Sequence, residues 1–166
     1  MKKLIAILIL TAAAAGCSGG EAPEAHRKAE SHKAPHNGVL NAIEKCSVGH
    51  VEALLEGNKL TLYFVGGHDK TTTSLPIAAE SMELSIELEN GSEKILVLDA
   101  KPMKLAGEKI GNCSRFEVAD DFLKGITRFD ASSEVEINGT LRTITIHYPE
   151  GYHPGHKEHE HHEGSE

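Results

Sequence analysis

The chain has 166 residues, a formal net charge of −8, no Trp, and aromatic side chains at only 4% of its residues. Binding to nucleic acids depends on cationic contacts to phosphates, so we expect no nucleic-acid partner for this acidic chain. The scarcity of aromatic rings also leaves little material for surfaces that stack bases or sugars. The unusual element of the composition is its eleven histidines.

The first element, residues 1–16 (MKKLIAILILTAAAAG), predicts a secretory signal peptide. Two lysines precede a short apolar run that is too short to span a bilayer, and small residues follow it. The sequence AAGC resembles the lipobox of bacterial lipoproteins, although Ala14 stands where Leu is usual. The resemblance implies that Cys17 is the lipidated N-terminus of the mature chain. Because Ser18, not Asp, follows the Cys, the resemblance also implies a lipid-anchored position in the cell envelope, at the periplasmic face of the outer membrane in a cell that has one. Ordinary cleavage, with Cys17 incidental, is the alternative.

Three segments follow the signal peptide. Residues 17–37 mix Gly, Pro, Ala and charged residues without apolar periodicity, which predicts a flexible tether. Residues 38–148 carry regular apolar patterns and predict one domain. Residues 149–166 lack core-forming side chains and predict a disordered, His-rich tail.

The domain contains three segments that predict β-hairpins. HVEALLEGNKLTLYFV alternates on both sides of Gly57-Asn58, and pairing Glu56 with Lys59 places Val51 opposite Phe64 on one apolar face. MELSIELENGSEKILVLDA turns near Asn90-Gly91, with Ile95 and Val97 on its returning strand. FDASSEVEINGTLRTITIHY turns at Asn138-Gly139.

Shorter apolar runs near residues 39–43, 75–78 and 114–118 predict further strands, and DDFLKG predicts a short helix. Seven or eight short, half-buried strands at this spacing are typical of an antiparallel β-sandwich of the immunoglobulin-like kind. The fold class expected is therefore an all-β sandwich with one short helix, and a small barrel is the alternative.

The cysteines fit an oxidising compartment. If Cys17 carries lipid, Cys46 and Cys113 remain as an even pair outside the cytoplasm. We therefore predict a disulfide between them.

Motifs for catalysis are missing from the sequence. It has no GxSxG turn, no HExxH pair and no Gly-rich phosphate loop. Asp and Glu fall mostly on the polar phase of the predicted strands, where a solvated face is expected. We therefore predict that the protein is not an enzyme.

The C-terminal sequence GYHPGHKEHEHHEGSE concentrates five histidines. Neutral imidazole is the commonest metal-ligating side chain, and it suits Zn, Cu and Ni. We predict metal binding by this tail without an obligatory cofactor, and a merely solvated tail is the alternative. Within the domain, His50 and His147 are expected to be exposed or packed on the sheet, and His68 to lie in a solvated loop. The predicted metal ligands are His153, His156, His159, His161 and His162.

The stretch from PHNGVL through HVEALLEGNKLTLYFV resembles a small exported β domain found in, or alongside, the periplasmic adaptor proteins of bacterial heavy-metal efflux systems. Those domains carry a His-Gly-Gly element before the first strand, whereas this chain has His36-Asn37-Gly38. The resemblance implies an association with transition-metal homeostasis, and it transfers no catalytic residue.

These observations predict an exported, lipid-anchored lipoprotein that binds Zn, Cu or Ni and buffers or delivers the metal at the cell envelope. Its expected partners are the membrane, through the lipid, and a metal-efflux or other envelope protein. The alternative is an envelope lipoprotein whose β domain is a protein–protein interaction module without metal.

Overall fold

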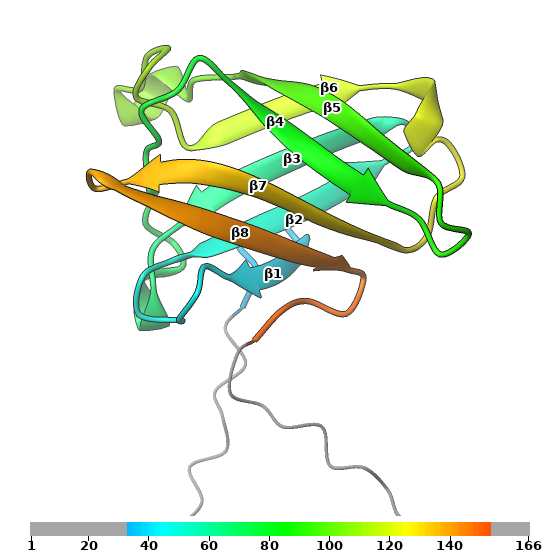
Figure 1. Ribbon diagram of the computed structural model, residues 1–166. Helices are drawn as coiled ribbons and strands as arrows, with labels where there is room; N and C mark the ends of the chain where they lie inside the picture. The colour runs from blue at the N-terminus through cyan, green and yellow to red at the C-terminus, as the bar shows by residue number, and fades with distance from the viewer. Residues whose placement is uncertain (1–32, 154–166) are drawn as a thin grey trace, which may run out of the picture. The chain divides into compact units, whose positions relative to one another are not determined.

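The computed structural model describes residues 33–153, which form eight β-strands and three short 3-10 turns (Figure 1). No helix in this range is long and apolar enough to cross a membrane. The strands are β1 (Val39–Ala42), β2 (His50–Glu56), β3 (Lys59–Val65), β4 (Ser81–Glu87), β5 (Glu93–Ala100), β6 (Arg115–Ala119), β7 (Phe129–Ile137) and β8 (Thr140–Tyr148), and the turns are η1 (His68–Lys70), η2 (Lys104–Ala106) and η3 (Asp121–Leu123).

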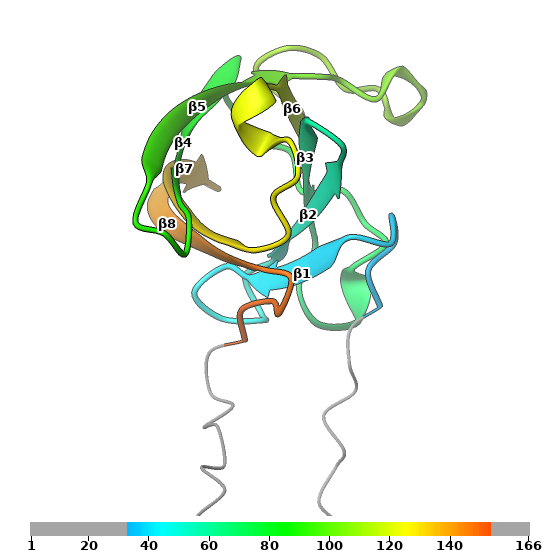
Figure 2. The same cartoon turned by 90° about the vertical axis from the view of Figure 1, so that its right-hand side faces the viewer.

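All eight strands belong to one sheet, in the order β1-β2-β3-β6-β5-β4-β7-β8, with antiparallel neighbours throughout. The sheet curls into a nearly closed barrel, seen end-on in Figure 2. The all-β, antiparallel prediction is confirmed, but the two-sheet sandwich is not. β6 pairs with both β3 and β5, which joins strands that a sandwich would divide between two sheets. Alternation of apolar and polar residues could not reveal this, because it is the same in sandwiches and barrels.

Two of the predicted hairpins have the predicted register. Glu56 lies opposite Lys59 and Val51 opposite Phe64. In the β7–β8 hairpin, Asn138 (φ 52°) and Gly139 (φ 76°) form the turn. Two consecutive positive φ angles are typical of a type I′ turn, whose twist matches that of the strands it joins.

The β4–β5 hairpin also forms, but Ile95 and Val97, the residues singled out on its returning strand, are not the ones that face the core. Leu96 lies opposite Leu84, and both are buried in the core with Leu98. Ile95 and Val97 therefore point to solvent, where they remain 63% and 53% exposed.

The predicted short helix is a single 3-10 turn, η3. The side chain of Asp120 caps it by accepting a hydrogen bond from Phe122 N at 2.8 Å. Lys94 Nζ donates to both Asp120 oxygens, and this bond, together with the cap, lowers the pKa of Asp120. Of the shorter apolar runs, those near residues 39–43 and 114–118 become β1 and β6. The run near residues 75–78 makes only an isolated bridge between Ile77 and Cys113.

The barrel interior is filled by buried apolar side chains of β2 to β8, together with others from the segments between strands, such as Ile43 and Ile77. Phe64 and Phe116 are both fully buried there and meet edge to face, with ring centroids 5.8 Å apart. This geometry is favourable for aromatic pairs. The interior is therefore a packed core, and the candidate sites lie on its outer surface and at its ends.

A buried carboxylate fastens the first described residues to the outside of β2. Glu52 is fully buried, and it accepts hydrogen bonds from His36 N at 2.8 Å, His36 Nδ1 at 2.8 Å and Gly38 N at 2.7 Å. The His36 ring also stacks on Tyr63, with centroids 3.7 Å apart. A Cβ at Gly38 would lie 2.6 Å from the Ala53 carbonyl oxygen, so only glycine fits there. We call the contact of His36 and Gly38 with Glu52 the N-terminal clamp.

Candidate metal site

Three potential metal ligands meet at one end of the barrel. Cys46 lies in the loop between β1 and β2, His50 is the first residue of β2, and His153 follows β8. One ligand atom from each side chain lies within 4.8 Å of those of the other two. We call Cys46, His50 and His153 the Cys-His-His cluster.

The folding of the β1–β2 loop positions the first two ligands. Ile43 N donates to Gly49 O at 3.0 Å, which closes the loop and returns the chain into β2. Cys46 O accepts from His68 N at 2.9 Å, so the loop is held against the chain that follows β3. A Cβ at Gly67 would lie only 2.4 Å from Cys46 O, so this close approach requires a glycine.

The hydrogen bond of His50 determines which of its nitrogens can bind a metal. Its ring is fully buried, and Nδ1 lies 3.3 Å from the carbonyl oxygen of Gly66. A carbonyl oxygen can only accept, so Nδ1 carries a proton, and in the neutral ring the lone pair is therefore on Nε2. Metal-binding histidines in proteins are commonly oriented in this way, by donating their other ring nitrogen to a carbonyl or carboxylate.

The donor set is suited to a transition metal. A thiolate favours Cu⁺ and Zn²⁺, while imidazole suits Zn, Cu and Ni. With metal–ligand bonds of about 2.0–2.3 Å in a tetrahedral site, neighbouring ligand atoms would be about 3.5 Å apart. The three ligand atoms lie within 4.8 Å of one another, so side-chain adjustments of about 1 Å would allow all three to bind one ion. Three protein ligands would leave a fourth coordination position for a further ligand.

The cluster includes one of the five histidines predicted from the tail, His153, and two residues that were not predicted as ligands. Cys46 was assigned to a disulfide, and His50 to an exposed or sheet-packed position. The signal that could have found them is the short spacing Cys-x₃-His, CSVGH, at the start of a strand. His156, His159, His161 and His162 lie outside the described residues, as does Cys17.

The remaining domain histidines have other environments. His68 is exposed in η1. His147 Nδ1 lies 2.6 Å from Asp130 Oδ1. Neither joins the Cys-His-His cluster.

Cys46 and Cys113 are both free thiols in the structure, so the disulfide expected between them is not formed there. Cys113 lies in the core, where its thiol donates to Arg115 O at 3.0 Å. Burial raises the pKa of the Cys113 thiol and so disfavours the reactive thiolate. Cys46 instead lies next to His50 and His153. Sequence counting could pair the two cysteines, but it could not show that they lie in different environments.

We expect the two thiols to react at different rates. Iodoacetamide should alkylate half-buried Cys46 in the native protein, whereas buried Cys113 should react only after unfolding. Saturating Zn²⁺ should protect Cys46, because a thiolate bound to metal is not available as a nucleophile. Mass spectrometry of the alkylated peptides measures both. Finding Cys46 and Cys113 joined in one peptide would contradict this expectation.

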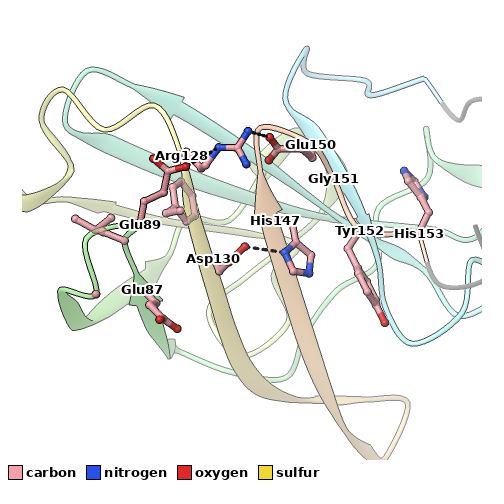
Figure 3. Close-up of a pocket in the computed structure, with 12 residues that line it drawn as sticks. Glu87, Glu89, Arg128, Asp130, His147, Glu150, Gly151, Tyr152 and His153 are labelled. Atoms are coloured by element: carbon pink, nitrogen blue, oxygen red, sulfur yellow. Dashed lines mark hydrogen bonds and ion pairs between the residues drawn. The ribbon is translucent and has the colours of Figure 1, made fainter. Parts of the chain in front are cut away.

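A pocket of about 740 Å³ adjoins the cluster and shares His153 with it. Figure 3 shows that several of its polar side chains contact one another, with His147 directed at Asp130 and Arg128 at Glu150. Arg128 Nε also lies 3.1 Å from a carboxylate oxygen of Glu89. The last four residues of the described chain form one side of the pocket: Glu150, Gly151, Tyr152 and His153.

The chain matches no protein-family model, no curated protein and no solved structure.

Proposed function

We propose that this protein is an exported, lipid-anchored lipoprotein that binds a transition-metal ion and buffers or delivers it at the cell envelope. The observation that carries the proposal is the Cys-His-His cluster, in which three metal-ligating side chains approach within 4.8 Å at one end of the barrel. Zn²⁺, copper and Ni²⁺ are the metals that this donor set favours.

The surroundings of the cluster support a binding role. The hydrogen bond of His50 Nδ1 to Gly66 O leaves Nε2 as the ring nitrogen that can bind a metal. Because residue 67 is a glycine, the loop that carries Cys46 can pack closely against the chain after β3. The site is partly open, because Cys46 and His153 are only half-buried. An ion bound there could exchange with an outside ligand or partner, as buffering or delivery requires.

The tail histidines would be an additional source of ligands. His156 follows His153 by three residues, and His159, His161 and His162 come next in the sequence. Their number predicts weaker, interchangeable binding of further ions, since neighbouring imidazoles can replace one another as ligands. The barrel cluster would then be the single tight site.

Titrations of three chains test this proposal. We expect the full chain to bind more than one Zn²⁺ per molecule at pH 7.5, by calorimetry. A chain ending at His153 should keep one tight site and lose the weaker ones, whereas a chain ending at Tyr152 should lose the tight site too. If the chain ending at His153 already binds no metal, the metal site is in the tail, residues 154–166. If none of the three chains binds Zn²⁺, Cu²⁺ or Ni²⁺, the interaction module without metal is the better account.

The anchor is tested separately. Cys17→Ser removes the atom that would carry lipid, so this variant should move from the membrane fraction to the soluble exported fraction. Fractionation and immunoblotting measure the shift, and Ser18→Ala is the matched control. A Cys17→Ser chain that remains in membranes would exclude Cys17 as the anchor.

A further inference from the structure

The barrel closes along a seam between the two edge strands of its sheet, β1 and β8 (Figure 2). Within residues 33–153, no strand pairing joins β1 to β8. Instead, the buried side chain of Asn41 accepts from His147 N at 2.9 Å, and Ala42 N donates to Tyr152 O at 2.6 Å. An ion pair between Arg142 of β8 and Glu44, two residues after β1, also crosses the seam. Isolated contacts thus take the place of the ladder of hydrogen bonds that joins the other neighbouring strands.

The segment that follows β8 packs tightly at this seam. Gly151 N donates to His147 O at 2.7 Å, and the φ of Gly151 is +83°. A Cβ at this position would lie 2.6 Å from Leu40 O on β1. Residues 149–153 therefore run across β1, and they bring His153 to the β1–β2 loop.

The ligands of the Cys-His-His cluster lie on both sides of the seam. Cys46 and His50 belong to the β1–β2 side, whereas His153 is the residue after Tyr152, whose carbonyl accepts the seam hydrogen bond. A metal ion bound to all three would cross-link the two edges of the sheet at the point where few hydrogen bonds hold them.

We propose that metal occupancy of the Cys-His-His cluster fastens the barrel seam, so that residues 149–153 are held more firmly against β1 in the metal-bound protein than in the metal-free protein. This inference rests on the proposed metal-binding function. It also makes the rigidity of the neighbouring pocket depend on the metal. Four of the twelve residues that line the pocket belong to the fastened segment, so this side of the pocket becomes more rigid when the metal is bound.

Amide hydrogen exchange of the full chain, with and without Zn²⁺, tests the proposal. Zn²⁺ should slow exchange at least tenfold at the seam amides of Ala42, His147 and Gly151. Exchange in the β4–β5 hairpin should change much less, because it lies away from the seam. Calorimetry on the same samples establishes whether Zn²⁺ is bound.

Two variants separate the bridge from simple binding. His153→Ala keeps Cys46 and His50 but removes the ligand across the seam, so Zn²⁺ should no longer slow exchange at Ala42. Replacing His156, His159, His161 and His162 together by Ala should leave that slowing intact.

The outcomes distinguish this inference from the function on which it rests. Zn²⁺ binding without slower seam exchange would overturn the fastening while leaving metal binding in place. Seam protection that persists in His153→Ala would also overturn it, because the bridge would not pass through that residue. A protein that binds no Zn²⁺, Cu²⁺ or Ni²⁺ would overturn both proposals.

Discussion

Cys46→Ser should lower the affinity of the chain ending at His153 for Zn²⁺ by about 100-fold or more. Loss of a residue that merely orients a ligand typically costs 10- to 100-fold in affinity, and loss of a ligand should cost at least as much. Serine is nearly the size of cysteine, and Cys46 is only half-buried, so the fold should be preserved. Substitution with Co²⁺ gives a second measurement, because the ultraviolet thiolate-to-metal absorption should disappear in this variant.

The matched control is His68→Asn, which removes an exposed imidazole outside the cluster. Asn tolerates the positive φ of 51° at this position, so the change should not strain the backbone. Its Zn²⁺ affinity should equal that of the unchanged chain. Equal affinity in Cys46→Ser and His68→Asn would exclude Cys46 as a ligand.

Because imidazole and thiolate ligands must lose their protons to bind metal, the affinity of the unchanged chain for Zn²⁺ should also fall between about pH 7.5 and about pH 5.5.

The second large effect is expected at the N-terminal clamp. Glu52→Ala should lower the free energy of unfolding by about 2–4 kcal/mol, because it removes three hydrogen bonds to a fully buried carboxylate. Glu52→Gln should lose less, since its amide oxygen can still accept from His36 N and Gly38 N. Urea unfolding measures both differences.

Glu56→Ala is the control for the clamp, because Glu56 lies on the same strand with an exposed side chain that makes only a surface ion pair with Lys59. Such pairs contribute about 0–1 kcal/mol, so this variant should be nearly as stable as the unchanged chain. If Glu52→Ala were no less stable than Glu56→Ala, His36 and Gly38 would not be fastened through this carboxylate.

The hairpins were predictable because local patterning determines them. The alternation around Gly57-Asn58 and Asn138-Gly139 fixes both the turn and the register, since a shift of one residue would turn the apolar face outward. The order of strands in the sheet was not predictable. The pairings of β3 with β6 and of β4 with β7 join segments that are far apart in the sequence, and no local signal encodes them.

The candidate site was missed because both ends of the described chain fold back over the outer face of β2. On the alternating pattern, His50 and Glu52 point away from the core, as the polar phase predicts, and such residues are normally solvated. Here His36 and Gly38 cover Glu52, while His153 and the β1–β2 loop lie against His50. Periodicity shows which way a side chain points, but not whether another segment of the chain covers it.

Closure of the seam affects the order in which the protein folds. Asn41 and His147 are 106 residues apart, so their hydrogen bond cannot form until nearly all of the domain is available. Contacts between distant residues form slowly, because the intervening chain must first be ordered. A chain that is synthesised or translocated from its N-terminus can form the β2–β3 hairpin early, but its sheet keeps two open edges until β8 arrives. Truncation before His147 would make this state permanent, and exposed strand edges promote pairing between molecules and aggregation.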